Sequence, residues 1–363
     1  MILHTFAISS YENLGWRLMA LGRIEEARKA FDEALSRKLD NDFLHLGLYS
    51  LAFLAVDAQG KASQAAWFEG KSDLRHEILS GESDTAAYGG HLARARELTR
   101  RAVDSAVRAS NPEAAAAARL ISALREAAFG NAAEARRETE EAIRLAPDGR
   151  DAEPQAALAY VWAGDEGGAQ KLENELKKRF PLDTIVNDYW LPIVEARMEL
   201  AKDNPAGALD RLQVLQSAMQ FGSIPNYAIA TCPYSVYTRG EAYLAAGQGS
   251  PAAGEFQKIL DHAGIVLNCA NGALAHLGLG RAYALEAGTG GTAVAAVRNA
   301  ARTKGETPMD PERLPMPQAD ALAKARAAYQ DFFTLWKDAD PHPHPQASEG
   351  GVGKVAVIPA TKC

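Results

Sequence analysis

The stretch 15–35, "GWRLMALGRIEEARKAFDEAL", decides the fold. It keeps several positions small around one large residue, Phe31. Gly22 predicts the end of a helix, because glycine adopts the left-handed conformation at low steric cost. The residues after Gly22 carry apolar side chains along one helical face, which predicts a second helix. Gly15 and Ala27 are small enough to let these two helices pack closely, and Phe31 is then expected to face the next pair.

The second-helix pattern recurs along the chain. It consists of an alanine, a larger residue four positions later, and a small or apolar residue three positions after that. Ala135 and Ala169 lie 34 residues apart, and Ala27 and Ala95 are separated by two such periods. The matches are Ala27–Phe31–Ala34, Ala95–Thr99–Ala102, Ala135–Thr139–Ala142, Ala169–Glu173–Leu176, Ala208–Leu212–Leu215, Ala252–Phe256–Ile259 and Ala325–Tyr329–Phe332.

The first helices share a second pattern, a glycine followed by a bulky residue three positions later. It occurs at Gly15, Gly240 and Gly280. A period near 34 residues with these two patterns is the signature of the tetratricopeptide repeat. Each helix pair is too small to bury its own apolar face, so it must stack on its neighbours. The sequence therefore predicts an all-α, right-handed superhelical solenoid of tetratricopeptide type.

The chain divides by composition into four segments. Residues 1–285 form the predicted repeat array. Residues 286–318 are rich in Gly, Thr, Pro and charge, which predicts a flexible loop inserted between the two helices of the last unit. Residues 319–341 are predicted to be the last repeat helix. Residues 342–363 have no helical period and are predicted to be disordered.

Composition excludes several classes of function. Hydrophobic residues make up 47% of the chain, but aromatic residues only 7%, which favours closely packed helices over a sheet. No apolar run approaches the roughly 20 residues that span a bilayer, and the N-terminal residues do not resemble a signal peptide. The net charge of −7 argues against broad binding to nucleic acid. We therefore expect neither a nucleic-acid partner nor a membrane segment.

Two short motifs could carry chemistry. "GTGGT", starting at Gly288, lacks the Lys-Ser/Thr of a phosphate-binding loop and follows no strand, so a flexible loop is the better interpretation. "PHPHP" places His342 and His344 two residues apart without a third ligand, which indicates adventitious metal binding or none. Catalytic motifs of proteases, esterases and kinases do not occur. We expect no catalytic residue, no cofactor and no metal site.

The concave face of such a stack suits an extended peptide or a partner helix. The register of the first helices selects the side chains that would line it, and exposed aromatic residues there suit protein recognition. The alternative for each one is packing against a neighbouring helix. The candidates are Glu12, Trp16 and Met19 in the first unit, Tyr234, Tyr237, Glu241 and Leu244 later, and Leu277 and Arg281 in the last unit.

Two of the three cysteines, Cys232 and Cys269, precede the first helices of adjacent units, at the same end of the stack. Two unrelated thiols are one interpretation. A disulfide is the other, and it would indicate an oxidising compartment. A bridge requires the two Cα atoms to lie within about 7 Å.

Several longer segments resemble one family, the tetratricopeptide C-terminal half of large bacterial serine/threonine protein kinases of the acidobacterial type. The resemblance covers residues from about Ser10 to Pro341. It is carried by "FGNAAEARRETEEAIRLAPDGRD", "KRFPLDTIVNDYWLPIVEA", "GEAYLAAGQGSPAAGEFQKILDHAGIV", "GALAHLGLGRAYAL" and "KARAAYQDFFTLWKDADP".

The resemblance implies a non-catalytic scaffold, the sensor or docking half of a signalling kinase, because the kinase domain itself has no counterpart in this sequence. It implies a cytoplasmic location if the chain is free-standing and an extracytoplasmic one if it is half of a membrane-spanning kinase. The alternative is the partner-binding half of a transcription regulator, since the same repeats also follow DNA-binding domains. The identity of the partner is not encoded in the repeat pattern.

The tail from His342 onward departs from the resembled family. Relatives continue with a segment similar to "DIPILKQA", which begins a closing helix. A single-base slip in a coding sequence for that segment reads His-Pro-His-Pro-Gln-Ala-Ser, as residues 342–348 do here. We therefore expect residues 342–363 to be out of frame.

Overall fold

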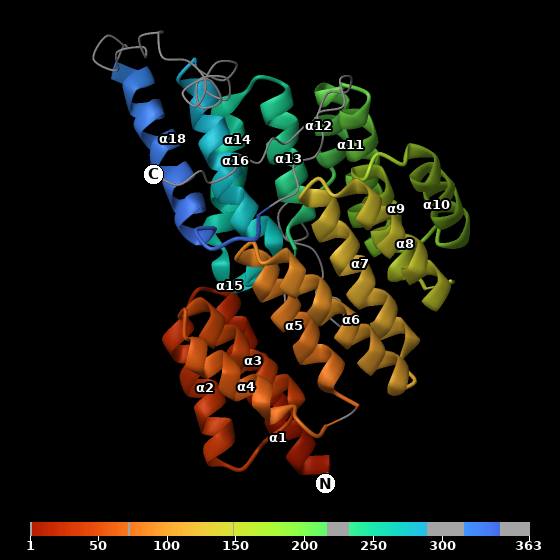
Figure 1. Ribbon diagram of the computed structural model, residues 1–363, viewed down its shortest axis with the longest axis vertical. Coiled ribbons are helices and arrows are strands. Elements are labelled where there is room, and N and C mark those ends of the chain that lie inside the picture. The colour runs from red at the N-terminus through yellow and green to blue at the C-terminus, as the bar shows by residue number, and fades with distance from the viewer. Residues whose placement is uncertain (1, 72, 148, 216–231, 289–315, 342–363) are drawn as a thin grey trace.

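Antiparallel helix pairs stack side by side along the chain (Figure 1). The computed structural model describes residues 2–71, 73–147, 149–215, 232–288 and 316–341, and the described residues form no strand. The helices are α1 (Ile2–Ala20), α2 (Ile24–Ser36), α3 (Asp42–Leu54), α4 (Ala58–Trp67), α5 (Arg75–Tyr88), α6 (Leu92–Arg108), α7 (Pro112–Ala128), α8 (Ala132–Leu145), α9 (Ala152–Trp162), α10 (Glu166–Arg179), the π-helix η1 (Val186–Trp190), α11 (Leu191–Ala201), α12 (Pro205–Leu212), α13 (Tyr234–Ala245), α14 (Gly249–Asp261), α15 (Ala263–Val266), α16 (Ala270–Glu286) and α18 (Met316–Leu335).

Glycine and asparagine residues mark where several helices end and begin. Gly22 has φ of 72°, in the left-handed region that favours glycine, and it joins α1 to α2. Asparagine side chains begin several helices: the Asn41 side chain accepts a hydrogen bond from the Leu44 backbone N–H at 3.0 Å. Such a cap satisfies one of the N–H groups that the first helical turn leaves unpaired.

The phenylalanine of the opening stretch occupies a socket made by two glycines. A Cβ added to Gly15 of α1 would lie 2.3 Å from the Phe31 ring, and one added to Gly47 of α3 would lie 2.6 Å from it. Phe31 is fully buried. The prediction that Phe31 faces the next pair is therefore confirmed, because its ring fills the space between the first helices of two successive pairs.

The same socket recurs near the other end of the array. The Phe256 ring lies between Gly240 of α13 and Gly278 of α16, where an added Cβ would approach it to 2.8 and 2.5 Å. In both sockets the aromatic residue follows the first glycine by 16 positions. We call these two arrangements the phenylalanine sockets.

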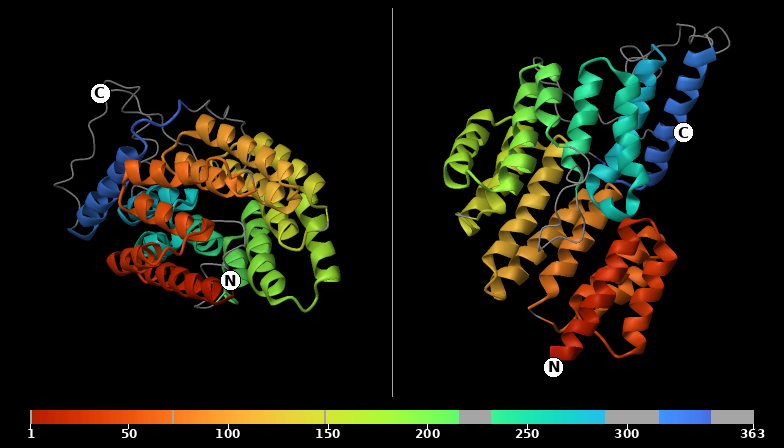
Figure 2. Two further views of the ribbon diagram at one scale, coloured as in Figure 1. Left: turned by 90° about the horizontal axis from the view of Figure 1, so that it is seen from below. Right: turned by 180° about the vertical axis from the view of Figure 1, so that it is seen from behind.

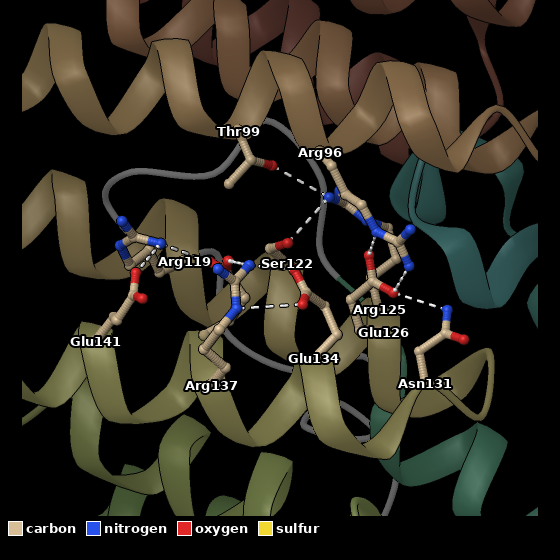
Figure 3. A network of polar contacts seen from close by, with 11 residues as sticks. Arg96, Thr99, Arg119, Ser122, Arg125, Glu126, Asn131, Glu134, Arg137 and Glu141 are labelled. Atoms are coloured by element: carbon tan, nitrogen blue, oxygen red, sulfur yellow. Dashed lines mark hydrogen bonds and ion pairs between the residues drawn. The ribbon is translucent and has the colours of Figure 1, made fainter.

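The middle of the array uses polar contacts at the same position. Thr99 of α6 follows Ser83 of α5 by 16 residues, and the two side chains are hydrogen-bonded at 2.9 Å. The Arg125 guanidinium of α7 donates to Thr99 at 3.1 Å and pairs with Asp84 of α5 at 2.9 Å. Figure 3 shows Thr99 and Arg125 within a wider network of polar contacts over α6, α7 and α8. We call this region the polar middle; it contains Ser83, Asp84, Arg96, Thr99, Arg125 and Glu126.

The superhelix turns back on itself, so that its last helices contact its first ones (Figures 1 and 2). Helix α15 packs on α1, and α16 packs on α5 and α7. The Asn268 side chain, ahead of α16, donates to the Gly81 carbonyl of α5 at 2.8 Å. The Trp336 indole N–H, after α18, donates to the Tyr88 carbonyl at 3.0 Å. The concave side of the array is therefore occupied in part by the chain's own C-terminal helices.

The element boundaries can be set beside the four expected segments. Helix α16 extends through Glu286, and α18 begins at Met316 rather than at residue 319. Most of the expected loop 286–318 lies outside the described residues. The tail 342–363, with His342 and His344, lies outside them as well.

Candidate partner-binding surface

The tyrosines expected on an open groove are buried. Tyr234 and Tyr237 of α13 are 7% and 4% exposed. Their rings lie 6.2 and 6.0 Å from the ring of Trp162, at the end of α9. Tyr237 also contacts Phe256 at 5.6 Å. The expectation that these two tyrosines face a peptide groove is wrong, because the tight curvature brings the inner faces of α9, α11 and α13 together.

The remaining C-terminal candidates are built into the same interior. Leu277 of α16 is buried, so its placement on an open groove is also wrong. Glu241 pairs with Arg197 of α11, whose guanidinium lies 3.9 Å from the centre of the Trp162 ring. Leu244 and Arg281 are half-buried. The structure thus builds Leu277 and Leu244 into the packed interior and holds Glu241 in an ion pair.

The first-unit candidates divide between interior and surface. Met19 is fully buried and does not face a groove, because α15 covers this end of α1: a Cβ added to Gly264 would lie 1.9 Å from the Met19 carbonyl oxygen. Glu12 is 4% exposed, so the expectation of an exposed Glu12 is wrong too. Trp16 is half-buried and stacks on Phe43 of α3, with the ring centres 5.2 Å apart.

Phe43 is a surface residue that the sequence analysis did not select. It is 43% exposed and lies in the first turn of α3, directly after the cap at Asn41. Leu14 of α1 is 51% exposed. A large aromatic residue at the exposed start of a first helix is the signal that could have identified Phe43. Trp16 and Phe43 together provide a partly exposed aromatic stack on the N-terminal helices.

The two inner cysteines are bonded in the structure. Cys232 precedes α13, and Cys269 occupies the position just before the first residue of α16. A disulfide joins them, with the Cα atoms 5.4 Å apart. The geometric requirement for a bridge is therefore met. Asn268, next to Cys269, contacts Gly81 and Thr85 of α5, so the bridge lies where the C-terminal helices meet the N-terminal half.

The described residues contain no cluster of three or more His, Cys, Asp or Glu side chains that could hold a metal ion. Within the same residues, no helix is both long and apolar enough to cross a bilayer.

One family model matches the start of the array, in agreement with its helical architecture. Residues 9–41 match the family model of the tetratricopeptide repeat. Among solved structures, the chain is similar to the crystal structure of the TPR domain of P58(IPK), with 13% identity, coverage of 89% of this chain and 98% of that chain, and a TM-score of 0.23. No curated protein matches the sequence significantly. The fold is a tetratricopeptide-type α-solenoid, and such repeats indicate a scaffold for protein–protein interaction.

Proposed function

We propose that this chain is a non-catalytic scaffold that binds a protein or peptide partner on the surface around Trp16 and Phe43. The observation that carries the proposal is the aromatic stack of these two residues, which is partly exposed on α1 and α3. Large aromatic side chains supply much of the binding energy at protein interfaces. The burial of Tyr234 and Tyr237 supports a partner surface at the N-terminal end of the array rather than at these tyrosines.

The scaffold role is proposed to serve a signalling serine/threonine kinase as its sensor or docking half. This part of the proposal is supported by the sequence resemblance of residues 10–341. The disulfide between Cys232 and Cys269 supports folding in an oxidising compartment, because such bonds persist where thiols are not kept reduced. An extracytoplasmic docking half agrees with both observations.

A photo-crosslinking experiment tests the partner surface. The full chain is produced in its own host with p-benzoylphenylalanine at position 43, and the adducts are identified by mass spectrometry after irradiation. The matched control carries the same amino acid in place of Leu182, which is 93% exposed and distant in sequence. We expect one discrete polypeptide adduct from position 43 that is absent from position 182. Identical adduct patterns, or no adduct at position 43, would contradict the proposed surface.

A further inference from the structure

The short connection between α14 and α16 contacts two N-terminal helices. It consists of α15 and the three residues after it, and we call residues 263–269 the closing segment. At one end, Gly264 lies so close to the Met19 carbonyl of α1 that a Cβ would not fit there. At the other end, the buried Asn268 side chain donates to the Gly81 carbonyl of α5 at 2.8 Å. Figure 1 shows α15 at this junction between the N-terminal helices and α16.

The closing segment contains a strained residue, Leu267. Its backbone has φ of 48° and ψ of −128°, a conformation that glycine adopts readily and other residues rarely do. Leu267 is buried, whereas the other described non-glycine residues with positive φ are all exposed: Lys38, Val56, Ser110 and Asp203. Strained backbone persists only where the surrounding structure holds it. The conformation of the closing segment therefore depends on what restrains its ends.

The disulfide restrains the end of the closing segment that follows Leu267. Cys269 is bonded to Cys232, 37 residues earlier, so the segment is attached to the residues just before α13. Leu267 lies two residues before this attachment, and Asn268 lies directly beside it. A covalent bond between distant residues limits the conformations that both can adopt. The bridge therefore restrains the strained backbone and the side chain that contacts α5.

We propose that the Cys232–Cys269 disulfide is a redox switch for the contact between the closing segment and the N-terminal helices. With the bridge intact, the closing segment stays on α1 and α5. With the bridge reduced, the backbone at Leu267 relaxes and Asn268 leaves the Gly81 carbonyl. The switch acts on contacts within the chain and does not require the partner surface proposed above.

The switching step is thiol–disulfide exchange with a dithiol reductant. One thiolate of the reductant attacks Sγ of Cys232, because Cys232 is half-buried while Cys269 is only 1% exposed. The S–S bond breaks, and Cys269 leaves as a thiolate that takes up a proton. The second thiolate of the reductant attacks the mixed disulfide, which releases Cys232 as a thiol and the reductant as its own disulfide. Two electrons and two protons thus pass from the reductant to the protein.

Hydrogen exchange of the full chain, followed by mass spectrometry, tests the switch. The chain is compared before and after reduction by dithiothreitol, in peptides that cover residues 17–22, 79–90 and 263–269. A peptide covering residues 132–145 is the internal reference, because it belongs to α8, which packs on α7 and α9. The variant Cys232→Ser cannot form the bridge. Its matched control is Cys363→Ser, which removes the third cysteine and keeps the bridge.

We expect reduction to accelerate exchange by about tenfold or more in the three peptides at the closing segment and its contacts, because local opening exposes protected amides. The reference peptide should stay within about twofold of its original rate. Cys232→Ser should exchange fast without reductant, whereas Cys363→Ser should behave like the original chain. Reoxidation of the original chain should restore slow exchange.

A second variant keeps the bridge and removes only the contact with α5. Asn268→Ala deletes the amide that donates to Gly81, so exchange in residues 79–90 should rise by about threefold or more in the oxidised chain. This variant keeps the proposal testable if Cys232→Ser loses its helical circular dichroism. Glutathione, a monothiol, tests the attack step: its mixed disulfide should form on Cys232 and not on Cys269.

Four results would overturn the proposal. The first is a bridge that dithiothreitol does not reduce in the folded chain, and the second is unchanged exchange after complete reduction. The third is equal acceleration in all peptides, including residues 132–145, which would show that the bridge only stabilises the fold in general. The fourth is unchanged exchange of residues 79–90 in Asn268→Ala. Glutathione found on Cys269 would overturn the assignment of Cys232 as the attacked sulfur.

Discussion

The phenylalanine sockets and the polar middle fill equivalent positions between adjacent helices, the former with an apolar ring and the latter with hydrogen-bonded polar side chains. In the sockets, Phe31 and Phe256 fill the space that glycines leave in the adjacent first helices. In the polar middle, Thr99 takes the equivalent position, and Ser83 stands where the first glycine would be. In the sockets, the missing glycine side chains leave room for a ring, whereas in the polar middle a hydrogen bond joins two smaller side chains.

The two regions differ in the interactions that stabilise them and in how their stability depends on pH. An aromatic ring in a glycine socket gains its stability from burial of apolar surface, which does not depend on pH. The polar middle gains its order from charged groups that must remain paired. Arg125 pairs with Asp84, and Arg96 pairs with Glu126, a pair that Figure 3 shows. Breaking one member of a buried ion pair leaves an uncompensated charge. The polar middle is therefore sensitive to pH, whereas the sockets are not.

The largest expected effect comes from emptying a socket. Phe256→Ala should lower the free energy of unfolding by about 3–5 kcal/mol, because the ring is fully buried and the glycines cannot fill the cavity. The equivalent truncation in the polar middle, Thr99→Ala, should cost about 1 kcal/mol, since it removes a hydroxyl that is hydrogen-bonded to Ser83. Urea unfolding followed by circular dichroism measures both.

Leu182→Ala provides the control for this pair, because Leu182 is 93% exposed and should change stability by less than about 0.5 kcal/mol. Equal costs at Phe256 and Thr99 would show that the two regions are not distinguished by burial of apolar volume.

The second effect depends on pH and belongs to the polar middle. Burial raises the pKa of Asp84 to about 6 even though Arg125 lowers it. A raised pKa means that folding favours the protonated carboxyl, so this contribution to stability is present at acid pH and is lost as pH rises through 6. Arg125→Met should therefore cost about 3 kcal/mol at pH 8, and less near pH 5, where Asp84 can take up a proton.

Thermal or urea unfolding of this variant at several pH values measures the difference. Arg23→Met, which breaks an exposed pair with Glu26, should leave stability unchanged at both pH values. The double variant Arg125→Met with Asp84→Leu should recover most of the loss, because it removes the unpaired charge. A cost of Arg125→Met that is the same at pH 5 and pH 8 would contradict the role of Asp84.

The sequence predicts the helix pairs well because their signals are local. The glycine and the phenylalanine of a socket are only 16 residues apart, and both belong to one helix pair. Helix α4, at residues Ala58–Trp67, carries no second-helix pattern, yet the Asp57 cap begins it and it pairs with α3. The repeat pattern thus misses helix pairs whose packing residues depart from it.

The groove residues were not predictable in the same way, because their exposure depends on the path of the whole superhelix. Each repeat adds a small rotation, and the sum brings Asn268 onto Gly81, 187 residues earlier. No local pattern encodes that sum, so Tyr237 was expected on a groove that the chain itself fills. The ion pairs between neighbouring repeats are easier to find in the sequence than the groove residues. Arg96 and Glu126, for example, are 30 residues apart, close to the length of one repeat. A search for opposite charges one repeat apart could have found them.

The smallest expected effect comes from the addition of one methyl group to a phenylalanine socket. Gly47→Ala would place a Cβ 2.6 Å from the Phe31 ring, so it should lower the free energy of unfolding by about 1–2 kcal/mol through overpacking. Gly254→Ala is the matched control, because nothing lies within 4 Å of its added Cβ on α14, and it should stabilise by about 0.5–1 kcal/mol through helix propensity. Urea unfolding measures both variants. Combining Gly47→Ala with Phe31→Leu should cost less than the sum of the single changes, since the smaller side chain removes the clash. Additive costs would mean that Phe31 and Gly47 are not one socket.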